Sequence, residues 1–268
     1  MEFDQLIEFW KGNPVADSPG FKVHCEDRKD LLRWIEEDHR RLAATTNRQS
    51  FGHDPKGAIH LNLSPVPYVG SLRTADIFVA MTNPTVGEQD YVDGDEPDFQ
   101  MMLQRNLNQL QEESCFALEK ISKWPSWSDY YRRLFNRFVR DYSRCSPRFV
   151  NRPEREREEV VWAELKSRVA ILELIPYYSQ NADYVVASGL HQVLPSSLAA
   201  KRALQKVADE RSKTDAYIIC RWKKGPERWG IRRERCAVGE HRGGLSAGVR
   251  HGLGSFLDQK PLFNCGPH

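Results

Sequence analysis

The feature that most constrains the fold of this chain is an apolar run that stops abruptly at a proline. Residues 76–82 have the composition of a buried strand, and Asn83-Pro84 ends it with a polar amide and a residue that cannot continue a sheet. Similar short runs predict strands at residues 169–175, 216–220 and 236–238. Helical patterns separate the main strands, so we expect an α/β fold with a doubly wound, mostly parallel sheet between layers of helices.

Length and composition allow one sizeable core with a helical extension. The chain has 268 residues, of which 40% are hydrophobic and 28% charged. We expect residues 1–70 to form an N-terminal helical extension packed on the core, and residues 71–268 to form the α/β domain. The acidic stretch at residues 88–98 is expected to be a solvated loop that caps the following helix. Helices are predicted at residues 2–12, 28–44, about 99–121, 127–142 and 154–168, with another beginning near residue 194.

Several classes of protein do not fit the sequence. No apolar stretch approaches the roughly 20 residues that a bilayer span needs, and the start of the sequence lacks the pattern of a signal peptide. The six cysteines never occur as Cys-x-x-Cys, so we expect reduced structural thiols and no metal site. These observations predict a cytoplasmic protein without a cofactor, and we expect it to be a monomer.

Basic residues gather toward the C-terminus. Residues 221–250 contain nine Lys or Arg and three Glu, a net charge of +6, interleaved with Trp222 and Trp229, whereas the whole chain carries +2. A basic segment with aromatic side chains suits a polyanion such as DNA, although the same pattern also occurs as a solvated basic edge. The candidates for contacts with DNA are Arg221, Lys223, Lys224 and Arg242.

Three polar motifs follow the predicted strands. The sequence has Met-Thr-Asn-Pro at residues 81–84, Leu-Glu-Leu-Ile-Pro at 172–176 and His-Arg-Gly-Gly-Leu-Ser at 241–246. Over residues 75–250 this order resembles the uracil-DNA glycosylase superfamily, whose motifs are Asp-Pro or Asn-Pro, Asn-x-x-Pro and His-Pro-Ser-x-Leu-Ser. Here the second motif has Glu for Asn, and the third has Arg-Gly for Pro-Ser. The resemblance implies a monofunctional DNA N-glycosylase that flips a base out of the helix and leaves an abasic site.

The resemblance also implies catalytic roles. Cleavage of an N-glycosidic bond builds positive charge on the sugar and negative charge on the base, so a site needs a positioned water and hydrogen-bond donors. Asn83 would orient the water, and His241, as a neutral donor, would stabilise charge on O2 of the base. Arg221 is a second candidate for that donor, or a clamp on a phosphate. His241 could equally be a phosphate contact and nothing more.

A flipped base needs a surface to stack on, and an apolar wedge commonly fills the space that it leaves. Tyr91 and Phe99 are the alternatives for the aromatic platform under the base. Leu245 is the candidate wedge, and Ser246 follows it in the same DNA-contacting loop.

Two departures from the family pattern predict the substrate. Two positions after the residue that matches Asn83, the classical uracil enzymes have a bulky tyrosine, which excludes substituents at C5 of the base. This chain has Thr85 at that position. Glu173 replaces the asparagine that reads uracil. A charged Glu173 would accept from the N4 amine of cytosine, whereas a protonated Glu173 would donate to N3. Both forms favour cytosine over uracil, and together with Thr85 they predict a 5-substituted cytosine. The resemblance then implies either an enzyme that removes oxidised cytosines or a bacterial defence enzyme that attacks the hydroxymethylated or glucosylated cytosine of phage DNA.

Other interpretations stay open at this point. The chain could be a uracil or mismatch DNA glycosylase, a non-catalytic DNA-binding relative, or a nuclease or small-molecule hydrolase on an unrelated sheet. Asn83 before a proline is also a common turn former. Glu173 could be a buried structural acid paired with an arginine such as Arg202.

Overall fold

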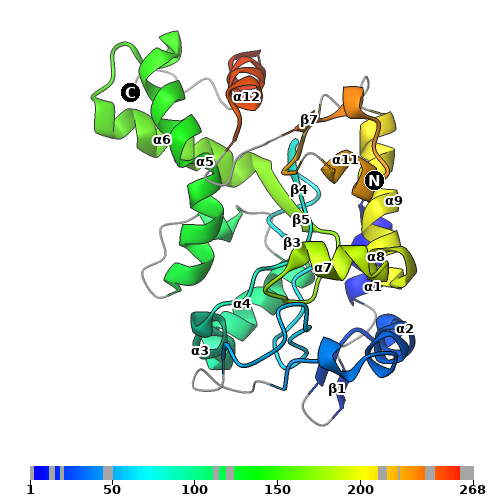
Figure 1. Ribbon diagram of the computed structural model, residues 1–268. Coiled ribbons are helices and arrows are strands. Elements are labelled where there is room, and N and C mark those ends of the chain that lie inside the picture. The colour runs from blue at the N-terminus through cyan, green and yellow to red at the C-terminus, as the bar shows by residue number, and fades with distance from the viewer. Residues whose placement is uncertain are drawn as a thin grey trace.

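A five-stranded sheet forms the core of the protein in the computed structural model shown in Figure 1. The strands lie in the order β3-β5-β4-β6-β7, and all neighbours are parallel except β3 and β5. This confirms an α/β fold with a mostly parallel sheet. The strands span Tyr68–Val69 (β3), Ile77–Met81 (β4), Val169–Glu173 (β5), Tyr217–Cys220 (β6) and Ala237–Val238 (β7). The structure describes residues 3–11, 16–18, 21–44, 51–110, 115–118, 124–210, 216–222, 224–238 and 245–259.

The central strand is β4, whose five residues are all buried. It pairs in parallel with β5 on one side and with β6 on the other, and Val79 lies opposite both Ile171 and Ile219. Successive side chains point to opposite faces of the sheet, so Phe78 joins one apolar cluster and Val79 joins the other. Burial on both faces explains why these strands are continuous apolar runs in the sequence.

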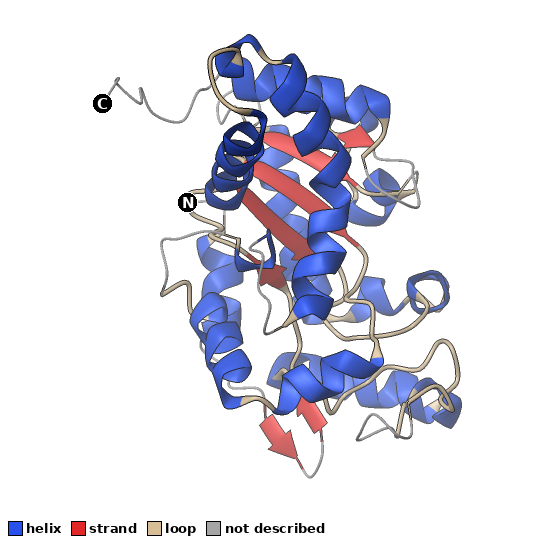
Figure 2. Cartoon of the chain, turned by 90° about the vertical axis from the view of Figure 1, so that its left-hand side faces the viewer, coloured by secondary structure: helices blue, strands red, loops and turns tan. Residues whose placement is uncertain are grey.

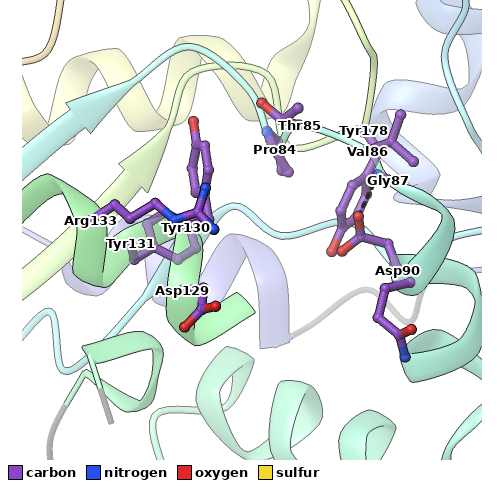
Figure 3. A pocket seen from close by; sticks show the side chains of 11 residues that line it. Pro84, Thr85, Val86, Gly87, Asp90, Asp129, Tyr130, Tyr131, Arg133 and Tyr178 are labelled. Atoms are coloured by element: carbon purple, nitrogen blue, oxygen red, sulfur yellow. Dashed lines mark hydrogen bonds between the residues drawn. The ribbon is translucent and has the colours of Figure 1, made fainter. Parts of the chain in front are cut away.

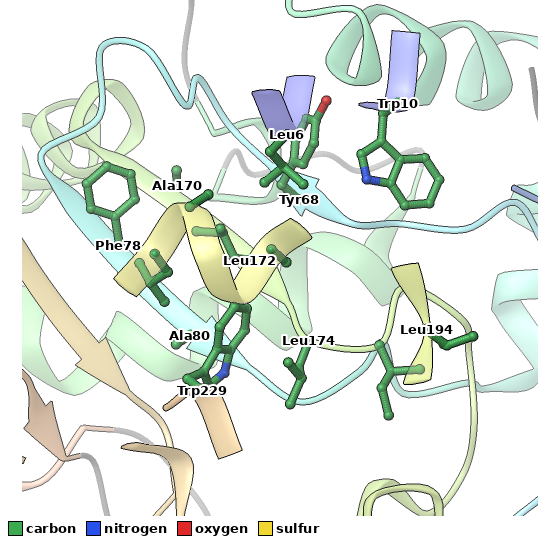
Figure 4. Packing of buried hydrophobic residues seen from close by; sticks show 14 of the residues in the cluster. Leu6, Trp10, Tyr68, Phe78, Ala80, Ala170, Leu172, Leu174, Leu194 and Trp229 are labelled. Carbon is green, nitrogen blue, oxygen red and sulfur yellow. The ribbon is translucent and has the colours of Figure 1, made fainter. Parts of the chain in front are cut away.

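Helices cover both faces of the sheet, as Figure 2 shows. The helices on one face are α1 (Asp4–Lys11), α2 (Cys25–Glu36), α9 (Pro195–Asp209) and α11 (Gly225–Trp229), and Figure 4 shows part of the apolar cluster beneath them. The helices on the other face are α5 (Pro125–Cys145), α6 (Glu154–Arg168) and α12 (Ala247–Gln259). Among the described residues, no helix is both long and apolar enough to cross a membrane.

The connections between strands decide where a ligand can bind. The chain leaves β4 toward the face covered by α5 and α6, whereas it leaves β5 and β6 toward the face covered by α9 and α11. Neighbouring strands whose following segments go to opposite faces open a crevice at their carboxyl ends. That crevice lies beyond Met81, Glu173 and Cys220, the last residues of the three central strands.

The N-terminal segment is packed on the core, but the predicted boundaries need correction. The sheet already begins at Tyr68, so the expected division between residues 70 and 71 falls after its first strand. The helix expected at residues 28–44 ends at Glu36, because the Asp38 carboxylate accepts from the Arg40 N–H at 3.1 Å and starts a 3₁₀ helix, His39–Arg41. The helix expected at residues 99–121 ends at Leu107, before Gln109 adopts a left-handed φ of 49°.

The acidic stretch at residues 88–98 is not a solvated loop. It forms α3 (Glu88–Asp95) and the start of α4 (Pro97–Leu107), and Asp93 is buried. Oδ2 of Asp90 accepts the Gly87 N–H at 2.6 Å and so caps α3 from inside the protein. The remaining described elements are β1 (Ala16–Ser18), β2 (Phe21–Val23), α7 (Ala182–Ala187), α8 (Leu190–Val193) and 3₁₀ helices at Phe116–Leu118, Pro147–Phe149 and Arg233–Arg235.

Candidate active site

A cavity of about 400 Å³ opens at the carboxyl end of β4. Four segments line it: the loop after β4, the start of the helix Glu88–Asp95 (α3), the first half of α5 and the loop after β5. Figure 3 shows Tyr130 and Tyr131 on one side of this cavity and Tyr178 and Asp90 on the other. The lining residues are Pro84, Thr85, Val86, Gly87, Gln89, Asp90, Asp129, Tyr130, Tyr131, Arg133 and Tyr178. We call this space the β4 cavity.

Asn83 directly precedes Pro84, a residue of the cavity wall, and its amide is held in one orientation. It is 4% exposed. Its Nδ2 donates to the carbonyl oxygen of Pro84 at 3.0 Å and to Oγ of Ser179 at 3.1 Å, and the carbonyl oxygens of Tyr177 and Ser179 lie at 3.5 Å. Carbonyl oxygens can only accept, so the NH₂ group must face them. The buried Oδ1 is turned the other way and accepts no hydrogen bond from the residues that the structure describes.

Glu173 ends β5 directly opposite Met81 of β4 and is 1% exposed. The Tyr131 hydroxyl donates to its Oε1 at 3.0 Å. Burial raises the pKa of Glu173 to about 8, although the Tyr131 hydrogen bond and the positive charge of Arg221 both lower it. The carboxyl group therefore carries a proton at neutral pH. Because Oε1 already accepts from Tyr131, the proton belongs on Oε2, which is buried and has no hydrogen-bond partner in the described part of the chain.

Arg221 brings a positive charge to the same edge of the sheet. It follows β6, and its Nη1 donates to the Tyr130 hydroxyl at 3.0 Å. Its guanidinium lies 5.1 Å from the ring centres of both Tyr130 and Trp222. Arg202, the suggested structural partner of Glu173, instead lies on α9 beside a different cavity and makes no ion pair with Glu173. The structure thus gathers Asn83, Glu173 and Arg221 at adjoining strand ends.

A buried histidine that the sequence did not single out lies behind the cavity wall. His60 is 1% exposed, its backbone N–H donates to the carbonyl oxygen of Tyr178 at 3.0 Å, and its Nδ1 hydrogen-bonds the Tyr91 hydroxyl. Burial lowers the pKa of His60 to about 4, so the ring is neutral. Burial also raises the pKa of Asp90, which lines the cavity on the same side as Tyr178, to about 7. Burial therefore disfavours the charged forms of both groups.

The two residues predicted as alternatives for the aromatic platform are buried. Tyr91 and Phe99 are 3% and 2% exposed, and neither lines the β4 cavity. Phe99 packs edge to face against Trp124, with ring centres 5.4 Å apart. The rings that do line the cavity are those of Tyr130, Tyr131 and Tyr178. The adjacent tyrosines of α5 are the only sequence signal for this surface, and such a pair is equally typical of a packed helix.

The motif at residues 241–246 is described only in part. His241, Arg242 and Lys223 lie outside the residues that the structure describes. Leu245 is 2% exposed and packs in the core, so the structure does not present it as a wedge. Ser246 lies just before α12, where its Oγ accepts the Val249 N–H at 3.4 Å. Its place in the fold is that of a helix cap.

A second and larger cavity, of about 940 Å³, adjoins the first. Thr85 lines both and forms part of the wall between them. Trp222, which is 37% exposed, and the exposed Lys224 line the outer part of this second cavity. Arg228 also lines it, with Nη2 held by Asp183 Oδ1 at 2.7 Å. The two cavities extend the site from the end of β4 toward the basic segment.

No protein-family model, curated protein or solved structure matches this chain. The chemistry of the site is therefore argued from its geometry. Among the described residues, no group of three or more His, Cys, Asp or Glu could hold a metal ion. What the site offers is a fixed acceptor on Asn83, a fixed donor on Glu173 and a positive charge on Arg221.

Proposed function

We propose that this protein is a monofunctional DNA glycosylase that releases a 5-substituted cytosine and leaves an abasic site. The observation that carries the proposal is the Asn83 amide. Its NH₂ group is held by Ser179 and Pro84, and its buried Oδ1 accepts no hydrogen bond from the described residues, one residue before the wall of a cavity of about 400 Å³. An oriented carbonyl oxygen can accept a proton of a water and direct the oxygen lone pair of that water at the sugar.

The surroundings of Asn83 suit the other half of the reaction. The departing base gains negative charge, which a nearby cation stabilises. Arg221 supplies that charge from the end of β6, and its guanidinium is held by Tyr130. The cavity falls within the volumes of small-molecule sites, about 300–1,000 Å³, and its tyrosines offer π-faces to a base.

Glu173 favours cytosine over uracil. With its proton on Oε2, it presents a donor that matches the N3 lone pair of cytosine. Uracil presents an N3–H at the same position, so two donors would face each other. Thr85 supports a substituent at C5, because this short, exposed side chain stands between the two cavities. Hydroxymethylated or glucosylated cytosine of phage DNA is the substrate that we propose.

A panel of duplexes tests the proposal. Each duplex carries one central cytosine, uracil, 5-hydroxymethylcytosine or glucosylated 5-hydroxymethylcytosine, and released bases and abasic sites are measured by mass spectrometry. We expect release of the substituted cytosines by the wild type and release about 10²–10³-fold slower by Asn83→Ala. Preferential release of uracil would overturn the substrate assignment. Salt-sensitive binding without any abasic product would instead indicate a non-catalytic DNA-binding relative.

A further inference from the structure

Tyr177, in the loop after β5, is anchored by the start of α2. Its hydroxyl donates to Oδ2 of Asp27 at 2.7 Å and accepts the backbone N–H of His24 at 3.3 Å. The other oxygen of Asp27 accepts the backbone N–H of Ser196, at the start of α9, at 2.8 Å. Tyr177 is 1% exposed and Asp27 is 0% exposed, so water does not compete for these hydrogen bonds. Two helices therefore fix the phenol group.

The same loop supplies three of the four acceptors around the Asn83 amide, and Pro84 supplies the fourth. Oγ of Ser179 lies 3.1 Å from Asn83 Nδ2, and the carbonyl oxygen of Tyr177 lies 3.5 Å from it. The backbone N–H of Ser179 donates to the carbonyl oxygen of Pro84 at 3.2 Å, so this loop runs beside the segment that carries Asn83. A shift of Tyr177 would move the partners of the amide.

We propose that Asp27 and Tyr177 are positioning residues for Asn83. They hold the loop after β5 in the place where its acceptors fix the orientation of the amide, and they act on the reaction only through Asn83. This inference rests on the proposed function. Misplacing a catalytic group by about 1 Å can cost about a hundredfold in rate. Through Asp27, the N-terminal extension would then contribute to catalysis as well as covering one face of the sheet.

The first test compares two buried tyrosines. Tyr177→Phe removes the hydroxyl and keeps the ring, and we expect the single-turnover rate of base release to fall by about tenfold to a hundredfold, with DNA affinity unchanged. Tyr68→Phe is the matched control. Tyr68, shown in Figure 4, is 0% exposed and donates to the carbonyl oxygen of Leu107 at 2.7 Å. Tyr68→Phe should lower Tm without slowing release.

A double-mutant cycle separates positioning from a general loss of structure. In the Asn83→Ala background, Tyr177→Phe should cause no further loss of the residual rate, because the group that it positions is gone. Asp27→Asn leaves one acceptor oxygen for the two hydrogen bonds, from Tyr177 and from Ser196, that the carboxyl group accepts, and it should behave like Tyr177→Phe in both backgrounds. Losses that multiply in the double variant, or equal losses for Tyr177→Phe and Tyr68→Phe, would overturn the positioning role.

A readout that does not need activity keeps this proposal distinct from the proposed function. The side-chain amide signals of Asn83 in an ¹⁵N–¹H spectrum are identified by their absence in Asn83→Ala. We expect them to shift and to exchange faster with solvent in Tyr177→Phe, but not in Tyr68→Phe. If the wild type releases no base while these signals respond as expected, the proposed function fails and the positioning contact stands. If they ignore Tyr177→Phe, the positioning proposal fails whatever the activity.

Discussion

The hydroxyl of Tyr131 donates to Oε1 of Glu173 at 3.0 Å, and this one contact decides what Glu173 can offer a ligand. It occupies one carboxyl oxygen with an external donor, so the proton of the neutral acid goes to the other oxygen. Tyr131 comes from α5 and Glu173 from the end of β5. The donor that we assign to base recognition therefore exists only because a helix and a strand meet at the β4 cavity.

Base release should decline as the pH rises through about 8. The pKa of Glu173 is raised to about 8, so the donor form is lost above that pH, and the rate should fall by about tenfold per pH unit. Glu173→Gln keeps a donor that does not titrate, and its rate should stay flat through pH 8. The measurement is single-turnover release between pH 5 and 10.

Asp90→Asn serves as the control for that profile, because the pKa of Asp90 is raised to about 7 in the same cavity. Asp90→Asn should keep the decline of base release near pH 8.

Folding stability gives a second check with a defined sign. The pKa of Glu173 is higher in the folded protein than its ordinary value of 4.5, so its contribution is fully present below pH 4.5 and is lost as the pH rises through about 8. If base release by Glu173→Gln declines near pH 8 as it does in the wild type, the assignment of Glu173 as the titrating donor is wrong.

Arg221→Met should slow base release and also move the pH profile. The charge of Arg221 lowers the pKa of Glu173, so its removal should shift the decline of the profile to a pH above 8. Arg250→Met is the control. Arg250, on α12, forms an ion pair with Asp141, on α5, at 3.4 Å. Arg250→Met should leave the profile in place. An unshifted profile in Arg221→Met would show that Arg221 does not act on Glu173.

Asn83→Ala should reduce the single-turnover rate by about 10²–10³-fold while leaving DNA affinity nearly unchanged. The matched control is Asn106→Ala. Asn106 is also buried, but its Oδ1 accepts the Gly70 N–H at 3.0 Å and its Nδ2 donates to the Tyr68 carbonyl at 2.7 Å. Losing these hydrogen bonds should cost about 1–3 kcal/mol of stability without slowing release. Comparable rate losses in the two variants would assign Asn83 a structural role.

Thr85→Tyr should narrow the passage between the two cavities. Thr85 lines both, so a phenol there would occupy the space that we assign to a C5 substituent. Release of glucosylated 5-hydroxymethylcytosine should fall by at least about tenfold, whereas release of any unsubstituted base should change less. Thr85→Ser keeps the hydroxyl and should resemble the wild type. The measurement is the ratio of kcat/KM for glucosylated 5-hydroxymethylcytosine to kcat/KM for an unsubstituted base. An unchanged ratio would exclude Thr85 as a specificity residue.

The sequence identified the strands and the polar residues that follow them. A strand buried on both faces must be apolar throughout, so β4, β5 and β6 stand out as runs that stop at Asn83, Pro176 and Arg221. Parallel strands bring their carboxyl ends to one edge, and the structure places Asn83, Glu173 and Arg221 there. The motif at residues 241–246 could not be compared with the structure in the same way, because His241 lies outside the described residues.

Only the tertiary structure decided which side chains surround the cavity. Large, mainly apolar side chains occur both in the cavity wall, as Tyr130 and Tyr131, and in the core, as Phe99 and Leu245. Nothing in the local sequence says which of them face a ligand. The packing of α5 against the strand ends turned the two tyrosines toward the cavity, whereas Phe99 and Leu245 became buried. The protonation of Glu173 has the same origin. Residue identity supplies a carboxyl group, but its charge depends on how completely the fold removes it from water.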